Sequence, residues 1–123
     1  MLKSLLVLFF VVSLHAVDSK EVYSLKDVIA KKQNNYYTIV LATLLPSLDY
    51  QKIIDENNIG YNAVAYNFGQ QDKFVKILFG AYKSYEEALD SLVKLNTSLL
   101  ANKPYIEKTE KHITLFHKYN NPL

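Results

Sequence analysis

The sequence contains no cysteine and no arginine. Without cysteine there is no disulfide framework, no thiolate metal site, no cysteine nucleophile and no lipid anchor on an N-terminal cysteine. Fourteen lysines stand against twelve acidic residues, which gives a formal net charge of +2. This near balance lacks the basic footprint of a protein that binds nucleic acid, so we expect no nucleic-acid partner. The 123 residues are enough for one domain, and a hydrophobic content of 50% is enough for a core.

Histidine is also rare, and its placement argues against catalysis. Beyond the N-terminal segment only His112 and His117 occur, five residues apart, which is not the spacing of a helical pair of metal ligands. Asp55 and Glu56 are adjacent and therefore do not share a helical face. Ser84 has the position of a helix cap rather than of a nucleophile. We therefore predict a protein that is not an enzyme and that uses no cofactor and no metal.

Residues 1–16 are typical of a secretory signal peptide. Lys3 supplies the positive charge, and residues 5–14 form an apolar run of about ten residues, shorter than the roughly 20 that a membrane-spanning helix needs. Ala16 offers a small residue for cleavage, which predicts a mature chain that begins at Val17. The alternative is an uncleaved segment that anchors the protein in the inner membrane. Both alternatives predict an exported, periplasmic protein.

The most informative stretch, residues 73–95, reads as a strand, a turn and a helix. Residues 74–79 form a β-prone run. Gly80 follows where the backbone must turn, and we expect it to end the strand. Ser84 stands three residues before Glu87, the spacing of a capping box at a helix start. Behind this cap, apolar residues recur at steps of three and four and indicate an amphipathic helix. They are Tyr85, Ala88, Leu92, Leu95 and Leu99.

The rest of the chain supplies the other elements of an α+β fold. Ser24 and Asp27 have capping-box spacing and predict a short helix, while Pro46 is favoured near a helix start. The expected elements are a lead-in with its helix at 17–35, a strand at 36–44, a helix after Pro46, a strand at 61–68, a loop at 69–72, a strand at 74–79, a helix after Ser84, a strand at 105–109 and a tail at 110–123. Residues 36–109 thus read βαββαβ, which predicts a four-stranded antiparallel sheet with two helices on one face.

The motif in the third strand and the helix after it resembles a known family. It consists of Phe74, Lys76, Ile77, Phe79, Gly80, Ala81 and Tyr82, followed by Glu87-Ala88. This order resembles the SPOR domain, the peptidoglycan-binding module of bacterial cell-division and cell-wall proteins. The resemblance spans about residues 36–109 and implies the ferredoxin-like βαββαβ fold of that family. The RNA-recognition domain shares this fold, but the third strand here lacks the Gly-aromatic pattern of its RNA-binding signature.

The resemblance also implies a glycan-binding site on the sheet. Phe74 takes the family's aromatic position and Lys76 its arginine position, although lysine cannot make arginine's planar bidentate contact. Thr43 keeps the hydroxyl of the family's serine, whereas Val40 replaces a glutamine that commonly hydrogen-bonds the sugar chain. Tyr66 on the second strand is expected to point the same way. The candidate glycan-binding residues are therefore Phe74, Lys76, Thr43, Val40 and Tyr66.

Alternation along the strands assigns residues to the two faces of the sheet. Ile77 and Phe79 are expected to face the two helices. The residues expected on the other, open face are Thr38, Val40, Ala42, Tyr66, Phe68, Phe74, Lys76 and Leu78. An uncovered apolar face on a small protein indicates a binding surface. The alternative is that the lead-in helix or the tail covers it.

Two functions of different class follow from these patterns. The first is a non-catalytic SPOR-like module that binds peptidoglycan glycan strands on the open face, in cell division or cell-wall organisation. Aromatic rings would pack on the sugars, and a few polar groups would fix their register. The second is a protein-interaction subunit of a periplasmic envelope complex, which would use the same face or the lead-in helix. Loss of the family's glutamine and arginine favours the second.

Overall fold

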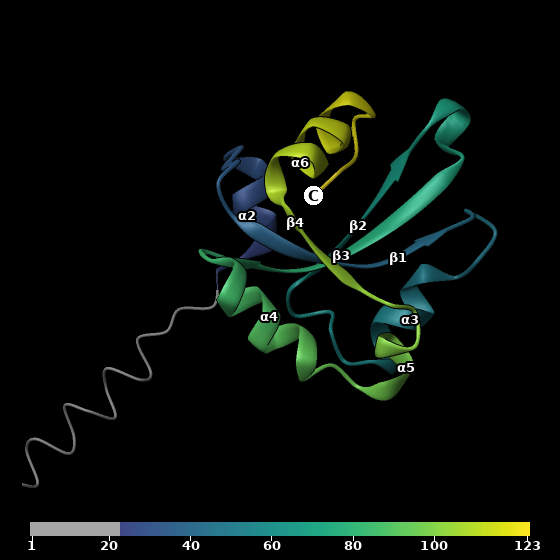
Figure 1. Cartoon of the computed structure of the whole chain (residues 1–123). Coiled ribbons are helices and arrows are strands. Elements are labelled where there is room, and N and C mark those ends of the chain that lie inside the picture. Colours follow the sequence, from purple (N-terminus) through teal and green to yellow (C-terminus); the bar gives the residue numbers. More distant parts are fainter. Residues whose placement is uncertain (1–22) are drawn as a thin grey trace, which may run out of the picture.

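The computed structural model describes residues 23–123 as a four-stranded antiparallel sheet with helices against both faces (Figure 1). Its elements are α2 (Leu25–Ala30), β1 (Tyr37–Leu44), α3 (Tyr50–Glu56), β2 (Ala63–Phe68), η1 (Gln70–Asp72), β3 (Phe74–Tyr82), α4 (Tyr85–Val93), α5 (Thr97–Leu100), β4 (Tyr105–Lys108) and α6 (Thr109–Lys118). The predicted signal peptide and its cleavage after Ala16 lie outside the described residues. Within residues 23–123, no helix has both the length and the apolar character needed to cross a bilayer.

The sheet has the strand order β2-β3-β1-β4, and every neighbouring pair is antiparallel. This arrangement confirms the predicted α+β fold with its βαββαβ order. The two central strands are β1 and β3, the most apolar of the four. In β3, every residue between Phe74 and Tyr82 is buried, which is typical of a strand that is covered on both faces.

One face of the sheet is covered by α3, α4 and α5, which lie below the sheet in Figure 1. Ile77 and Phe79 of β3 pack there against Ile54 of α3 and Leu99 of α5. Ala88 of α4 is fully buried. The prediction that Ile77 and Phe79 face the helices is therefore confirmed.

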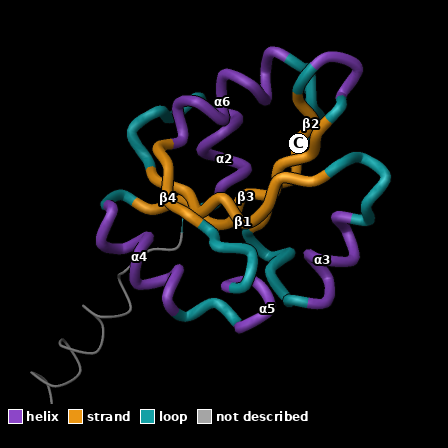
Figure 2. The backbone as a smooth tube through the Cα atoms, turned by 45° about the vertical axis from the view of Figure 1, so that its right-hand side comes forward, coloured by secondary structure: helices purple, strands orange, loops and turns teal. Residues whose placement is uncertain are grey.

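The opposite face is covered by α2 and α6, so the prediction of an open face is wrong (Figures 1 and 2). Of the alternatives left by the sequence, the covered one is correct, and both the lead-in and the tail take part. The tail pattern did not reveal α6, whose residues Ile113 and Phe116 are 4% and 2% exposed. The core on this face consists of Leu25, Val28, Ile29, Val40, Val64, Tyr66, Leu78, Ala81, Ile113 and Phe116.

Strand β3 does not end at Gly80 but continues to Tyr82. The pairing of Ile39 with Phe79 and of Tyr37 with Tyr82 leaves two β3 residues opposite one β1 residue, which is a β-bulge. Gly80 lies in this bulge with φ +76°, and a Cβ there would overlap the Tyr82 ring. Glycine therefore permits the strand to continue through a bulge here rather than terminating it.

A second register shift in β1 changes which residues share a face. Val40 pairs with Leu78 and Ala42 with Ile77, so Leu41 is an extra residue. The prediction that Ala42 lies with Val40 is wrong, because Ala42 packs on the α3 side. The same shift brings Thr43 opposite Lys76, and thus onto the face covered by α2 and α6.

Both predicted capping serines are confirmed at helix starts. Ser24 accepts a hydrogen bond from the Asp27 N–H (3.3 Å) at the start of α2, and Ser84 caps α4 in the same way. Pro46 does not open α3. That helix begins at Tyr50, and Asp49 supplies the side-chain cap. An aspartate side chain accepts a hydrogen bond from a free backbone N–H of the first turn, whereas a proline only lacks an N–H of its own.

Candidate functional site

The five candidate residues lie on one face of the sheet. Lys76 is paired with Tyr66 on β2 and with Thr43 on β1, and residues paired across antiparallel strands project to the same side. Val40 and Phe74 belong to the same side by their own pairing and packing. The sequence thus identified residues that the fold brings together.

Three of these five residues are buried. Val40 and Tyr66 are 1% exposed and Lys76 is 7% exposed, because α2 and α6 cover the middle of this face. A sugar chain that lies across the whole face would have to displace two packed helices. These three residues therefore support the fold, and a ligand can meet the face only at its uncovered end.

The uncovered end is the hairpin end of β2 and β3, where residues 70–73 are exposed and the hairpin diverges from α6 (Figure 1). Phe74 is half-buried and stacks on Phe68, with ring centroids 5.5 Å apart and an angle of 29° between the planes. Thr43 is exposed at the end of β1. Tyr105 of β4 pairs with Val40, so it projects to the same side, and it is 46% exposed. We refer to Thr43, Phe68, Phe74 and Tyr105 as the aromatic rim.

Lys76 lies beneath the rim and is held by an aromatic ring. Its ammonium nitrogen is 5.1 Å from the centroid of Phe68, the geometry of a cation–π contact. Burial lowers the pKa of Lys76, and the nearby Lys111 lowers it further, whereas Glu107 raises it. The aliphatic stem of Lys76 is thus part of the covered face.

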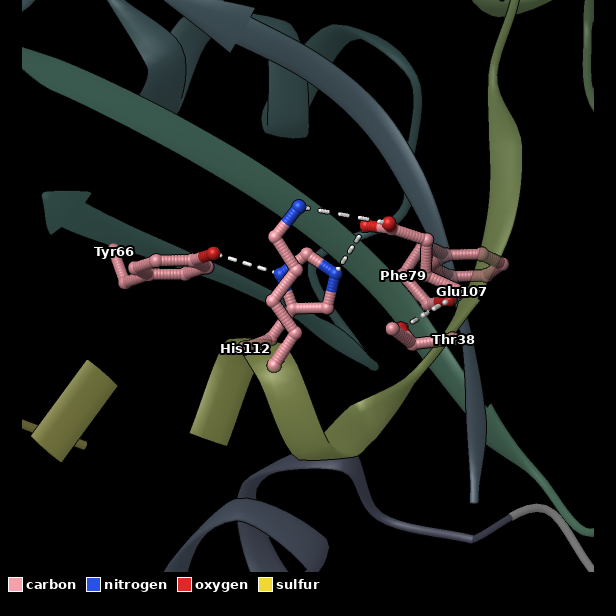
Figure 3. A network of polar contacts seen from close by, with 6 residues as sticks. Thr38, Tyr66, Phe79, Glu107 and His112 are labelled. Carbon is pink, nitrogen blue, oxygen red and sulfur yellow. Dashed lines mark hydrogen bonds and ion pairs between the residues drawn. The ribbon is translucent and has the colours of Figure 1, made fainter. Parts of the chain in front are cut away.

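A chain of polar contacts joins α6 to the sheet (Figure 3). It starts at Tyr66, which is paired with Lys76 across β2 and β3. The Tyr66 hydroxyl lies 2.7 Å from Nδ1 of His112, and Nε2 of His112 lies 2.8 Å from Oε1 of Glu107. A neutral imidazole with its proton on Nε2 satisfies both contacts, because Tyr66 then donates to Nδ1 and Nε2 donates to the carboxylate. The second carboxylate oxygen of Glu107 is 3.7 Å from the ammonium of Lys111.

Burial determines the protonation state of this network. His112 is 1% exposed, and its desolvation lowers its pKa to about 4, although Glu107 acts in the opposite direction. Desolvation raises the pKa of Tyr66 above its usual range, and the Glu107 charge raises it further. Near pH 7, His112 and Tyr66 are therefore both neutral. The network holds α6 on the sheet, and the buried Tyr66 hydroxyl is not accessible as a nucleophile.

The sequence pattern did not reveal the network because Glu107 and His112 belong to different elements. Glu107 is on β4 and His112 is on α6, so neither the strand period nor the helix period relates them. His117, the other histidine of the tail, lies elsewhere, with Nε2 3.1 Å from the carbonyl oxygen of Ile29 on α2. Within residues 23–123, no three residues of the types His, Cys, Asp and Glu are grouped as metal ligands would be.

The chain was compared with family models, with curated proteins and with solved structures. None of the three comparisons finds a match.

Proposed function

We propose that this chain is an exported, non-catalytic, SPOR-like module that binds peptidoglycan glycan strands in the periplasm, at the aromatic rim rather than across the whole sheet. Three observations support the proposal: the order of residues in β3 and α4, the four-stranded α+β fold, and the accessible aromatic residues at one end of the candidate face. The last of these carries it, because it leaves Phe74 and Thr43 within reach of a ligand.

The rim has a shape suited to a linear polysaccharide. It crosses the sheet from Tyr105 on β4, past Thr43 on β1, to Phe74 and Phe68 on β3 and β2. Its path is diagonal, because Tyr105 is level with Leu78, and Phe74 lies four residues away from Leu78 along β3. Three strand spacings of about 5 Å and four residues of about 3.3 Å each give a length of roughly 20 Å, more than one sugar ring. Aromatic faces pack on the apolar faces of sugars, and the Thr43 hydroxyl adds a donor and an acceptor.

The alternative is a protein-interaction subunit of an envelope complex. For this function the rim remains available as a docking surface, but the apolar face of the lead-in helix does not. Leu25, Val28 and Ile29, the apolar residues of α2, are at most 2% exposed because they pack on the sheet. A partner protein would therefore have to use the rim or another surface.

Cosedimentation with purified peptidoglycan sacculi tests the proposal. Phe74→Ala and Tyr105→Ala are each expected to weaken sedimentation while leaving the fold intact, as judged by circular dichroism. Tyr85→Ala is the matched control, because Tyr85 is also exposed (49%) but lies on α4, away from the rim. Failure of the wild-type protein to cosediment with sacculi that carry or lack stem peptides would remove the glycan proposal and leave the protein-docking alternative.

A further inference from the structure

A cavity of about 360 Å³ lies on the other side of the sheet from the rim, between the α3–β2 connection and the α4–α5 connection. This volume is within the range of about 300–1,000 Å³ that is typical of small-molecule sites. The lining residues are Asn57, Asn58, Ile59, Tyr61, Phe79, Ser91, Lys94, Leu95, Asn96 and Leu99. The cavity is separate from the residues to which the glycan proposal refers.

An exposed aromatic ring forms one wall of this cavity. Tyr61 is 75% exposed, the highest fraction among the large apolar side chains that are described. Its ring meets the edge of Phe79 at 5.5 Å between centroids and an angle of 89°. Phe79 is 6% exposed and belongs to the core, so it supports the Tyr61 ring from one side. An aromatic ring that is held in place but left uncovered loses little entropy when a ligand packs on it.

Oriented amides form the polar side. Oδ1 of Asn57 accepts hydrogen bonds from Nδ2 of Asn96 (2.7 Å) and from the Ser98 hydroxyl (2.8 Å), and Nδ2 of Asn57 donates to the Ile53 carbonyl (2.8 Å). Each amide nitrogen carries two N–H groups, so each of these two asparagines retains one donor. The Asn58 side chain has no hydrogen-bond partner within residues 23–123 and adds a complete amide.

The cavity has a single charge. Lys94 is its only charged lining residue, and its ammonium forms no ion pair with any residue of the described chain. No carboxylate of the described residues lines the cavity. One lysine suits a ligand with one negative charge, whereas a polyphosphate would require several cationic groups or backbone donors.

We infer that this cavity binds a single pyranose that carries a carboxylate, such as an acidic amino sugar. The Tyr61 ring packs on the apolar face of the sugar, Asn57, Asn58 and Asn96 donate to its hydroxyl or acetamido oxygens, and Lys94 pairs with the carboxylate. This site is additional to the aromatic rim and lies on the opposite face of the sheet.

Titration of the ¹⁵N-labelled protein, secreted and purified in its processed form, tests the inference by NMR. The probes are N-acetylmuramic acid, which has a carboxylate, and N-acetylglucosamine, which has none. We expect N-acetylmuramic acid to shift the amide signals of Asn57, Asn58 and Asn96 with a dissociation constant on the order of millimolar. N-acetylglucosamine is expected to bind the same residues more weakly.

Two variants with matched controls assign the contacts. Tyr61→Ala is expected to weaken binding of N-acetylmuramic acid at least about tenfold, whereas Tyr85→Ala, a second exposed tyrosine, leaves it unchanged. Lys94→Gln is expected to reduce the affinity for N-acetylmuramic acid to that for N-acetylglucosamine, whereas Lys31→Gln does not. Thermal melting of each variant shows that it remains folded.

The cavity site and the rim proposal predict different results. Shifts confined to Thr43, Phe74 and Tyr105, or an absence of shifts, would overturn the cavity site. Shifts of the amide signals of the cavity residues that persist in both Tyr61→Ala and Lys94→Gln would also overturn the cavity site. If the cavity binds the sugar but the wild-type protein does not cosediment with sacculi, the cavity site is supported and the proposed function is contradicted.

Discussion

The Tyr66 hydroxyl lies 2.7 Å from Nδ1 of His112 and thereby joins β2 to α6 inside the core. Both side chains are 1% exposed, and both are neutral near pH 7 because burial disfavours their charged forms. The contact therefore links the stability of the α6 side of the protein to the protonation of one histidine.

Stability is expected to fall as the pH is lowered from about 6.5 to about 4. The pKa of His112 is lowered from 6.5 to about 4 in the folded state, so the unfolded state binds the proton more readily in this window. The free energy of unfolding then rises with pH between these values, by up to about 3 kcal/mol. Urea denaturation at several pH values checks this.

The same measurement on His112→Gln should show a smaller pH slope between pH 4 and 6.5, although the variant is less stable throughout. His117→Gln is the control, because His117 lies outside the buried network and contacts a backbone carbonyl of α2. A slope that survives in His112→Gln would mean that another group causes it.

Lys76 tests whether the face is covered. An exposed lysine would be replaced by alanine with little effect, but Lys76 is 7% exposed and its ammonium lies over Phe68. Lys76→Ala should therefore lower the free energy of unfolding by about 1–3 kcal/mol through lost packing of the stem. Lys76→Met keeps the stem without the charge and should lose less than Lys76→Ala. Chemical denaturation of both variants measures the difference, and an unchanged Lys76→Ala would indicate that the face is open.

Val40→Gln provides a second test of the same face. This change would introduce the glutamine that the SPOR family carries at the corresponding position, and it would strengthen glycan binding if the face were open. In the structure Val40 is 1% exposed against Leu78, so the new amide is buried without a designed partner. We expect a loss of about 1–3 kcal/mol and no gain in cosedimentation. A stable variant that cosediments more strongly would contradict the covered face.

The sequence predicted the elements whose signals are local. The capping serines at Ser24 and Ser84 and the alternation that turns Ile77 and Phe79 toward the helices are confirmed, because each depends only on nearby residues. The second face is covered because α2 and α6 pack on it. This packing is long-range and cannot be read from the periodicity of any single segment. Likewise, the bulge at Leu41 depends on pairing between strands, and it moved Thr43 to the candidate face.

The same distinction between local and long-range information applies to the candidate site. The residues that resemble a glycan site do share one face, since strand register follows from the fold. Their burial was not predictable from the strands alone, because it is imposed by segments at both ends of the chain. Tyr105 was missed because it belongs to no motif and is placed only by its pairing with Val40.

Asn121 is expected to protect the outer edge of β2. Its Oδ1 accepts a hydrogen bond from the Asn67 N–H (2.8 Å) and its Nδ2 donates to the Asn67 carbonyl (2.9 Å), so one side chain occupies both groups as a neighbouring strand would. Edge strands with free N–H and C=O groups are prone to pair with other chains. Asn121→Ala should therefore lose about 1 kcal/mol of stability and speed hydrogen exchange at Asn67. Asn120→Ala is the control because Asn120 is exposed and, within residues 23–123, its side chain forms no hydrogen bond with Asn67. Equal exchange rates at Asn67 in the wild type and in Asn121→Ala would show that the C-terminal tail does not protect this edge in solution.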